Sequence, residues 1–134
     1  MSMNNVSRWI PIAVVVALAA CAPTIITPEE LVVNASLDET FSTVSNSINT
    51  EPYPDNTSGW VITDSDQAGG FISAELDGTQ CGFLGFSCSD YTARVSVALN
   101  DRGDGTTAVN ISQTQHELAR NLSQAIADRL RAIF

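Results

Sequence analysis

The sequence contains no lysine, one histidine and three cysteines among 134 residues, and its six arginines are outnumbered by fifteen acidic side chains. The formal net charge is therefore −9. A nucleic-acid-binding protein needs a basic surface to contact phosphates, so this composition argues against that class. The scarcity of histidine and cysteine leaves few ligands for a zinc site. We expect neither a metal nor a cofactor.

Apolar residues make up 44% of the chain and charged residues only 16%. A disordered acidic chain would have more charge and fewer apolar side chains, so we expect a packed core. The length predicts a single domain.

Residues 1–20 differ from everything that follows them. A polar start that carries one positive side chain, Arg8, precedes an uncharged apolar run over residues 9–20. The run is shorter than the about 20 residues that a helix needs to cross a bilayer. A short apolar run behind a positive start is typical of an export signal. The alternative is a buried helix or strand at the N-terminus.

The apolar run ends in Leu18-Ala19-Ala20-Cys21, which resembles the lipobox of bacterial lipoproteins. The resemblance implies that the signal is cleaved before Cys21 and that the Cys21 sulfur carries a diacylglyceryl group. It also implies a location at the outer membrane facing the periplasm, because Ala22 stands where inner-membrane lipoproteins usually have Asp. Cleavage would leave five arginines against fifteen acidic residues. The attachment would therefore depend on lipid and not on attraction to anionic headgroups.

The remaining chain divides into a tether over residues 21–30, which contains two prolines, and a single domain over residues 31–134. Capping-box patterns at Ser36-Leu37-Asp38-Glu39 and at Thr114-Gln115-His116-Glu117 predict the starts of two helices, the first ending near Asn49. Alternating apolar residues between turn-rich segments predict strands at residues 31–34, 59–64, 71–76, 91–99 and 106–113.

The order strand, helix, four strands, helix predicts an α+β fold, in which an antiparallel sheet of about five strands carries both helices on one face. This topology resembles the helix-grip domains of lipoproteins in the outer-membrane protein assembly machinery, over residues 31–134. Each predicted helix has an apolar stripe that would cover the sheet. The stripes consist of Leu37, Phe41, Val44 and Ile48, and of Leu118, Leu122, Ile126, Leu130 and Ile133.

Cys81 and Cys88 are the cysteines that remain if Cys21 carries lipid. An even number of cysteines in an exported protein favours a disulfide, here between the third and fourth predicted strands. In the chain-entropy model, closing a loop of about eight residues contributes ~2.5 kcal/mol. A redox-active pair or two buried thiols are the alternatives.

Phe83, Leu84 and Phe86 lie between these two cysteines, although surface loops are usually polar. Two interpretations are open. The three side chains could fold over the sheet and extend the core, or they could be exposed and bind a partner or lipid. If the protein has a binding interface, we expect it at these three residues, with an exposed strand edge as the second choice.

No set of residues has the pattern of a catalytic centre. His116 is the only imidazole and is expected in the first turn of a helix, where a solvated histidine is ordinary. The carboxylate pairs Asp64 with Asp66 and Asp101 with Asp104 are expected in turns, where aspartate accepts backbone hydrogen bonds. Neither pair has the spacing of a calcium loop. We therefore expect no catalytic residues and no metal site.

These observations favour a non-enzymatic lipoprotein of the cell envelope, anchored to a membrane by lipid, that binds another envelope protein as an accessory or assembly factor. One alternative is an exclusion or inhibitor lipoprotein of the kind that phages and plasmids encode. The other is a small hydrolase or ligand-binding module that uses Asp64, Asp66 or His116. That alternative requires a concave pocket that brings these groups together.

Overall fold

The computed structural model describes residues 30–134, so the export signal, Cys21 and the tether up to residue 29 lie outside the described residues. Neither helix of the described part has the length and apolar content that spanning a membrane requires. In chain order the elements are β1 (Leu31–Val33), α1 (Leu37–Thr50), β2 (Val61–Asp66), β3 (Phe71–Cys81), the 3₁₀ helix η1 (Phe83–Gly85), β4 (Cys88–Asp101), β5 (Thr107–Gln113) and α2 (Glu117–Ile133).

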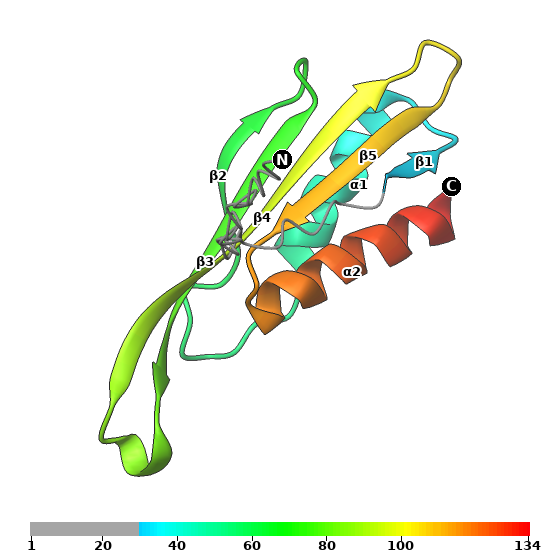
Figure 1. Cartoon of the computed structure of the whole chain (residues 1–134). Helices are drawn as coiled ribbons and strands as arrows, with labels where there is room; N and C mark the ends of the chain where they lie inside the picture. The colour runs from blue at the N-terminus through cyan, green and yellow to red at the C-terminus, as the bar shows by residue number, and fades with distance from the viewer. Residues whose placement is uncertain (1–29) are drawn as a thin grey trace, which may run out of the picture.

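The five strands form one sheet in the order β1-β5-β4-β3-β2, and every neighbouring pair is antiparallel. Helices α1 and α2 contact each other, and both contact β4, so they cover the same face of the sheet (Figure 1). The predicted α+β fold is confirmed. Residues 30–134 form five antiparallel strands and two α-helices.

The core lies between the helices and the sheet. Alternate residues of β4, from Ala93 to Leu99, face the helices and are at most 5% exposed. The apolar stripes predicted for the two helices pack against this face of the sheet. The exception is Ile133 at the end of α2, which is 53% exposed. Phe134, the C-cap of α2, packs against the core. The residues of the two predicted stripes that are at most 1% exposed are Val44, Ile48, Leu122, Ile126 and Leu130.

The first predicted capping box is present, and the second is not. At the start of α1, Glu39 N donates to Ser36 Oγ at 3.3 Å, and Ser36 N donates to the Glu39 carboxylate at 3.1 Å. At α2 the N-cap is His116, whose Nδ1 accepts from Leu118 N at 3.2 Å. Thr114 is bonded to Arg94 through both N and Oγ1 and so continues the pairing of β5 with β4. The predicted capping box at Thr114 was wrong, because Thr114 pairs with Arg94 of β4 and does not cap α2.

Strands β3 and β4 extend further than their alternation predicts. Apolar alternation indicated residues 71–76 and 91–99, whereas the strands reach Cys81 and begin at Cys88. The added residues bury neither face, so they leave no periodic pattern in the sequence. Strand β2 is also shifted along the chain, and Asp64 and Asp66 therefore lie in a strand instead of the predicted turn.

The cap of α1 makes stability depend on pH through Glu39. The hydrogen bond that Ser36 N donates lowers the pKa of Glu39, so the charged carboxylate stabilises the fold above its ordinary pKa and loses this effect as the pH falls through the lowered value. Urea unfolding should show Glu39→Gln less stable than the wild type at neutral pH and equal to it in acid. Ser36→Ala should instead lose about 1 kcal/mol, and a Glu39→Gln deficit that persists in acid would contradict this account.

Candidate functional site

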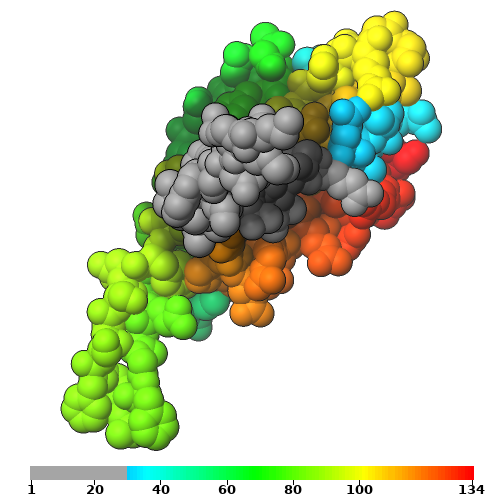
Figure 2. Space-filling model, in the orientation of Figure 1, coloured from blue at the N-terminus to red at the C-terminus, as the bar shows by residue number. Residues whose placement is uncertain are grey.

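Strands β3 and β4 remain paired beyond the point where their neighbours end. Strand β2 follows β3 only as far as Glu75, and β5 follows β4 only as far as Val95. Pairing of β3 with β4 continues to Cys81 and Cys88. Residues 77–92 are here called the ribbon. The segment before β2 still bonds the base of the ribbon, through Ser58 to Asp77 and through a bridge between Thr57 and Gly78. Beyond this base the ribbon projects from the body as a two-stranded arm (Figures 1 and 2). Every residue from 79 to 90 is exposed.

A disulfide closes the end of the ribbon. Cys81 and Cys88 lie opposite each other and are bonded, with their Cα atoms 4.0 Å apart. They are the terminal residues of β3 and β4, and not part of a loop between them. Gly82 N donates to Ser87 O at 2.6 Å, inside the ring that the disulfide closes. Gly85 N also donates to Gly82 O at 3.0 Å, so the turn is held by a covalent bond and two backbone hydrogen bonds without any packing against the body.

Phe83, Leu84 and Phe86 form the far end of the ribbon and are called the apolar tip. Their exposed fractions are 90%, 72% and 87%. The interpretation that they extend the core is wrong, because the ribbon carries them beyond the sheet. Leu84 has φ of +63° and is followed by Gly85 at +73°. A left-handed leucine costs of order 1–3 kcal/mol and is often found where a turn presents side chains for a function.

Tyr91 connects the base of the ribbon to the body. Its ring stacks on His116, with centroids 4.2 Å apart and an interplanar angle of 11°. It also lies across Gly78 on the partner strand, where a Cβ atom would be only 2.4 Å from the Tyr91 hydroxyl. Gly78 therefore allows the ring to lie flat, and the residue that caps α2 also supports the ribbon.

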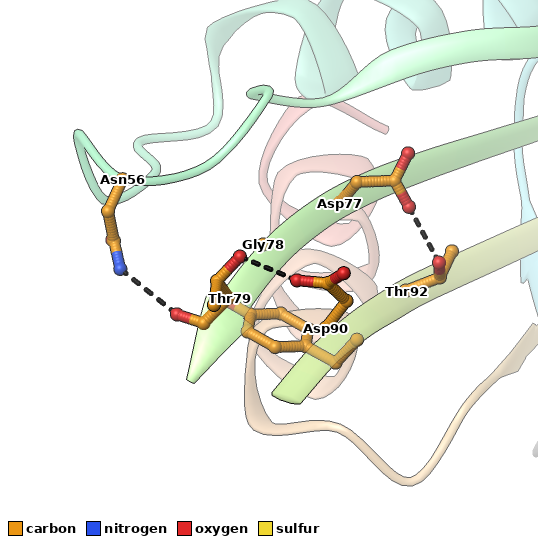
Figure 3. A pocket seen from close by; sticks show the side chains of 7 residues that line it. Asn56, Asp77, Gly78, Thr79, Asp90 and Thr92 are labelled. Carbon is orange, nitrogen blue, oxygen red and sulfur yellow. Dashed lines mark hydrogen bonds between the residues drawn. The ribbon is translucent and has the colours of Figure 1, made fainter. Parts of the chain in front are cut away.

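The opposite face of the ribbon carries two aspartate–threonine pairs, here called the acidic ladder (Figure 3). Thr92 Oγ1 donates to Asp77 Oδ1 at 2.6 Å, and Thr79 Oγ1 donates to Asp90 Oδ1 at 2.8 Å. Both pairs are directly opposite in the register, which orients the carboxylates. They line an open depression of about 410 Å³. The acidic ladder was not predicted from the sequence. If Cys81 faces Cys88, however, counting back two residues at a time on one strand and forward on the other pairs Thr79 with Asp90 and Asp77 with Thr92.

The residues considered for catalysis are not brought together. The depression beside His116, of about 500 Å³, is lined by neither Asp64 nor Asp66. Asp66 accepts a backbone hydrogen bond from Gly69 N at 2.9 Å. His116 serves as a helix cap and a stacking partner. Within residues 30–134, no group of three or more His, Cys, Asp and Glu side chains could hold a metal ion.

Asp101 and Asp104 both serve the turn between β4 and β5. Asp101 Oδ1 accepts from Gly103 N at 2.8 Å, and Asp104 Oδ1 accepts from Thr106 N at 3.0 Å. The hydrogen bonds from Thr106 lower the pKa of Asp104. Backbone hydrogen bonding in a turn is the role that the sequence analysis gave this pair.

No family model matches this chain, and no curated protein matches it. Among solved structures, the chain is similar to the Zhui aromatase/cyclase from Streptomyces sp. R1128. The TM-score is 0.30 and the identity 11%, over 78% of this chain and 84% of that one. A similarity of this size supports no functional conclusion.

The exposure of the apolar tip predicts how its loss affects stability. Phe83→Ser with Phe86→Ser should leave the melting temperature nearly unchanged, because neither ring contributes to the core. Ile126→Ala, at a fully buried position, should cost about 2–5 kcal/mol and lower the melting temperature by many degrees. A large drop for the double serine variant, measured by circular dichroism, would show that the tip packs against the body.

Proposed function

We propose that this protein is a lipoprotein of the bacterial cell envelope that is anchored by lipid on Cys21 and binds another envelope protein without catalysing a reaction. The export signal and the Leu18–Cys21 pattern support the anchor. The bonded pair Cys81 and Cys88 fits the oxidising conditions outside the cytosol. Residues 22–30 could span at most about 30 Å, so the domain would stay near its membrane.

The apolar tip is the observation that carries the binding function. Fully burying a large apolar side chain contributes about 1.5–3 kcal/mol, so the three side chains offer roughly 4–9 kcal/mol to a partner. That range corresponds to dissociation constants from about 1 mM to just below 1 μM, before the cost of association is subtracted. The disulfide reduces that cost, because it orders the turn before any partner binds.

The anchor can be tested by metabolic labelling and intact mass. Wild-type protein extracted from membranes should incorporate labelled palmitate and have the mass of residues 21–134 plus acyl chains. Cys21→Ser should incorporate no label and should retain residues 1–20, because the thiol that receives the lipid is absent. Unlabelled wild-type protein, or a labelled Cys21→Ser variant, would refute the anchor.

The binding function can be tested in intact cells with a carbodiimide, which couples carboxylates of this lysine-free chain to amines of a partner. The wild type should yield the same single protein adduct in repeated experiments, and Phe83→Ser with Phe86→Ser should lose it. Val61→Ser is the matched control, because Val61 is also an exposed apolar residue but lies on β2, where it pairs with Glu75 of β3, away from the apolar tip. The proposal fails if no adduct forms, or if the tip variant forms the same adduct as the wild type.

A further inference from the structure

The charges around the apolar tip are all of one sign. Residues 77–92 include Asp77 and Asp90 but no arginine, lysine or histidine. Arg94, just beyond the ribbon, is paired with Glu75 at 2.5 Å. A partner that covers the tip and the adjoining surface therefore meets uncompensated carboxylates.

The carboxylates and the disulfide share one face of the ribbon. Asp77, Thr79 and Cys81 alternate along β3 and lie opposite Thr92, Asp90 and Cys88 on β4. At about 3.3 Å per residue, Asp90 lies about 7 Å from the disulfide and Asp77 about 13 Å from it. The disulfide and the two carboxylates thus follow one another along one face, and the apolar tip lies at the end of that face.

Both carboxylates can accept further hydrogen bonds. Among the described residues, the threonine hydroxyls bond only the Oδ1 atoms of Asp77 and Asp90. Each Oδ2 is left for an external donor, and both side chains are on exposed residues. An arginine or lysine that approached this face would meet acceptors whose positions the fold has already set.

We infer that the apolar tip binds a protein pocket that is apolar inside and carries arginine or lysine side chains along one side. This inference rests on the proposed function and adds the chemistry of the partner. The pocket takes Phe83, Leu84 and Phe86, and its cationic side pairs with Asp77 and Asp90. The apolar contact supplies most of the affinity, and the charge pairs set the orientation and speed the encounter.

Two other occupants fit these charges less well. A bilayer with anionic lipids would repel the ladder, and inserting the tip deeply would bring Asp90 into a less polar region without a counter-charge. A second copy that covered this face about a two-fold axis near the ladder would place one acidic ladder against the other, which is unfavourable for like charges.

The occupant can be identified by photo-crosslinking from the tip. The full-length lipidated protein, with p-benzoylphenylalanine in place of Phe86, is irradiated in the cells that produce it, and the adduct is mapped by mass spectrometry. We expect one protein, crosslinked within an apolar pocket that has arginine or lysine beside it. An adduct with lipid acyl chains, with a second copy of this chain, or with a pocket lacking nearby cations would overturn the inference.

The role of charge can be tested with the partner so identified. Asp77→Asn with Asp90→Asn keeps the acceptors for the threonines but removes both charges. It should weaken binding about three- to tenfold at low salt and reduce the dependence of affinity on salt. Asp64→Asn with Asp128→Asn makes the same change in net charge on β2 and α2, and should bind like the wild type.

The outcomes separate this inference from the proposed function. If the ladder variant binds like the wild type while Phe83→Ser with Phe86→Ser does not bind, the cationic pocket is refuted and the protein-binding function stands. If no adduct forms from position 86, both are refuted. Equal melting temperatures for the variants and the wild type would show that any loss of binding does not come from unfolding.

Discussion

The pairing of β3 with β4 is the interaction on which the rest of the structure depends. One register runs without interruption from Phe71 and Ala98 to Cys81 and Cys88. Its inner half is buried, so a slip by one residue would turn Val95 and its apolar neighbours toward the uncovered face. The core therefore sets the register, and the register in turn aligns the cysteines at the far end.

The two halves of this pairing are stabilised by different forces. The inner half is held by burial against α1 and α2. The outer half packs against the core only through Tyr91 at its base, and an isolated two-stranded hairpin is marginal in water. The Cys81–Cys88 bond, the two aspartate–threonine hydrogen bonds and the Tyr91 ring over Gly78 take the place of a core there. Because these contacts stabilise the ribbon without a core, the three apolar side chains at its end stay exposed.

How much of the structure could be predicted depended on whether a segment has a buried face. The apolar residues of α1 and the alternation around Val95 and Val97 predicted the helix and the central strand, because one side of each is buried. The ribbon could not be predicted in this way, since the outer part of β3 and β4, which contains Gly78 and Asp90, has no row of buried apolar side chains. The cap of α2 was also missed, because Thr114 is used by β4.

Local chemistry in the sequence was therefore enough to specify the α+β layers, the order of the elements, the cysteine pair and the identity of the unusual apolar residues between the cysteines. Only the tertiary structure showed that Phe83, Leu84 and Phe86 point away from the body. It also showed that Asp77 and Asp90 are aligned on one face of the ribbon. Which side chains are exposed, and which share a face of the ribbon, depends on pairing between segments that are distant along the sequence. Composition and periodicity indicate which segments are buried, but they do not indicate how long an unburied hairpin is.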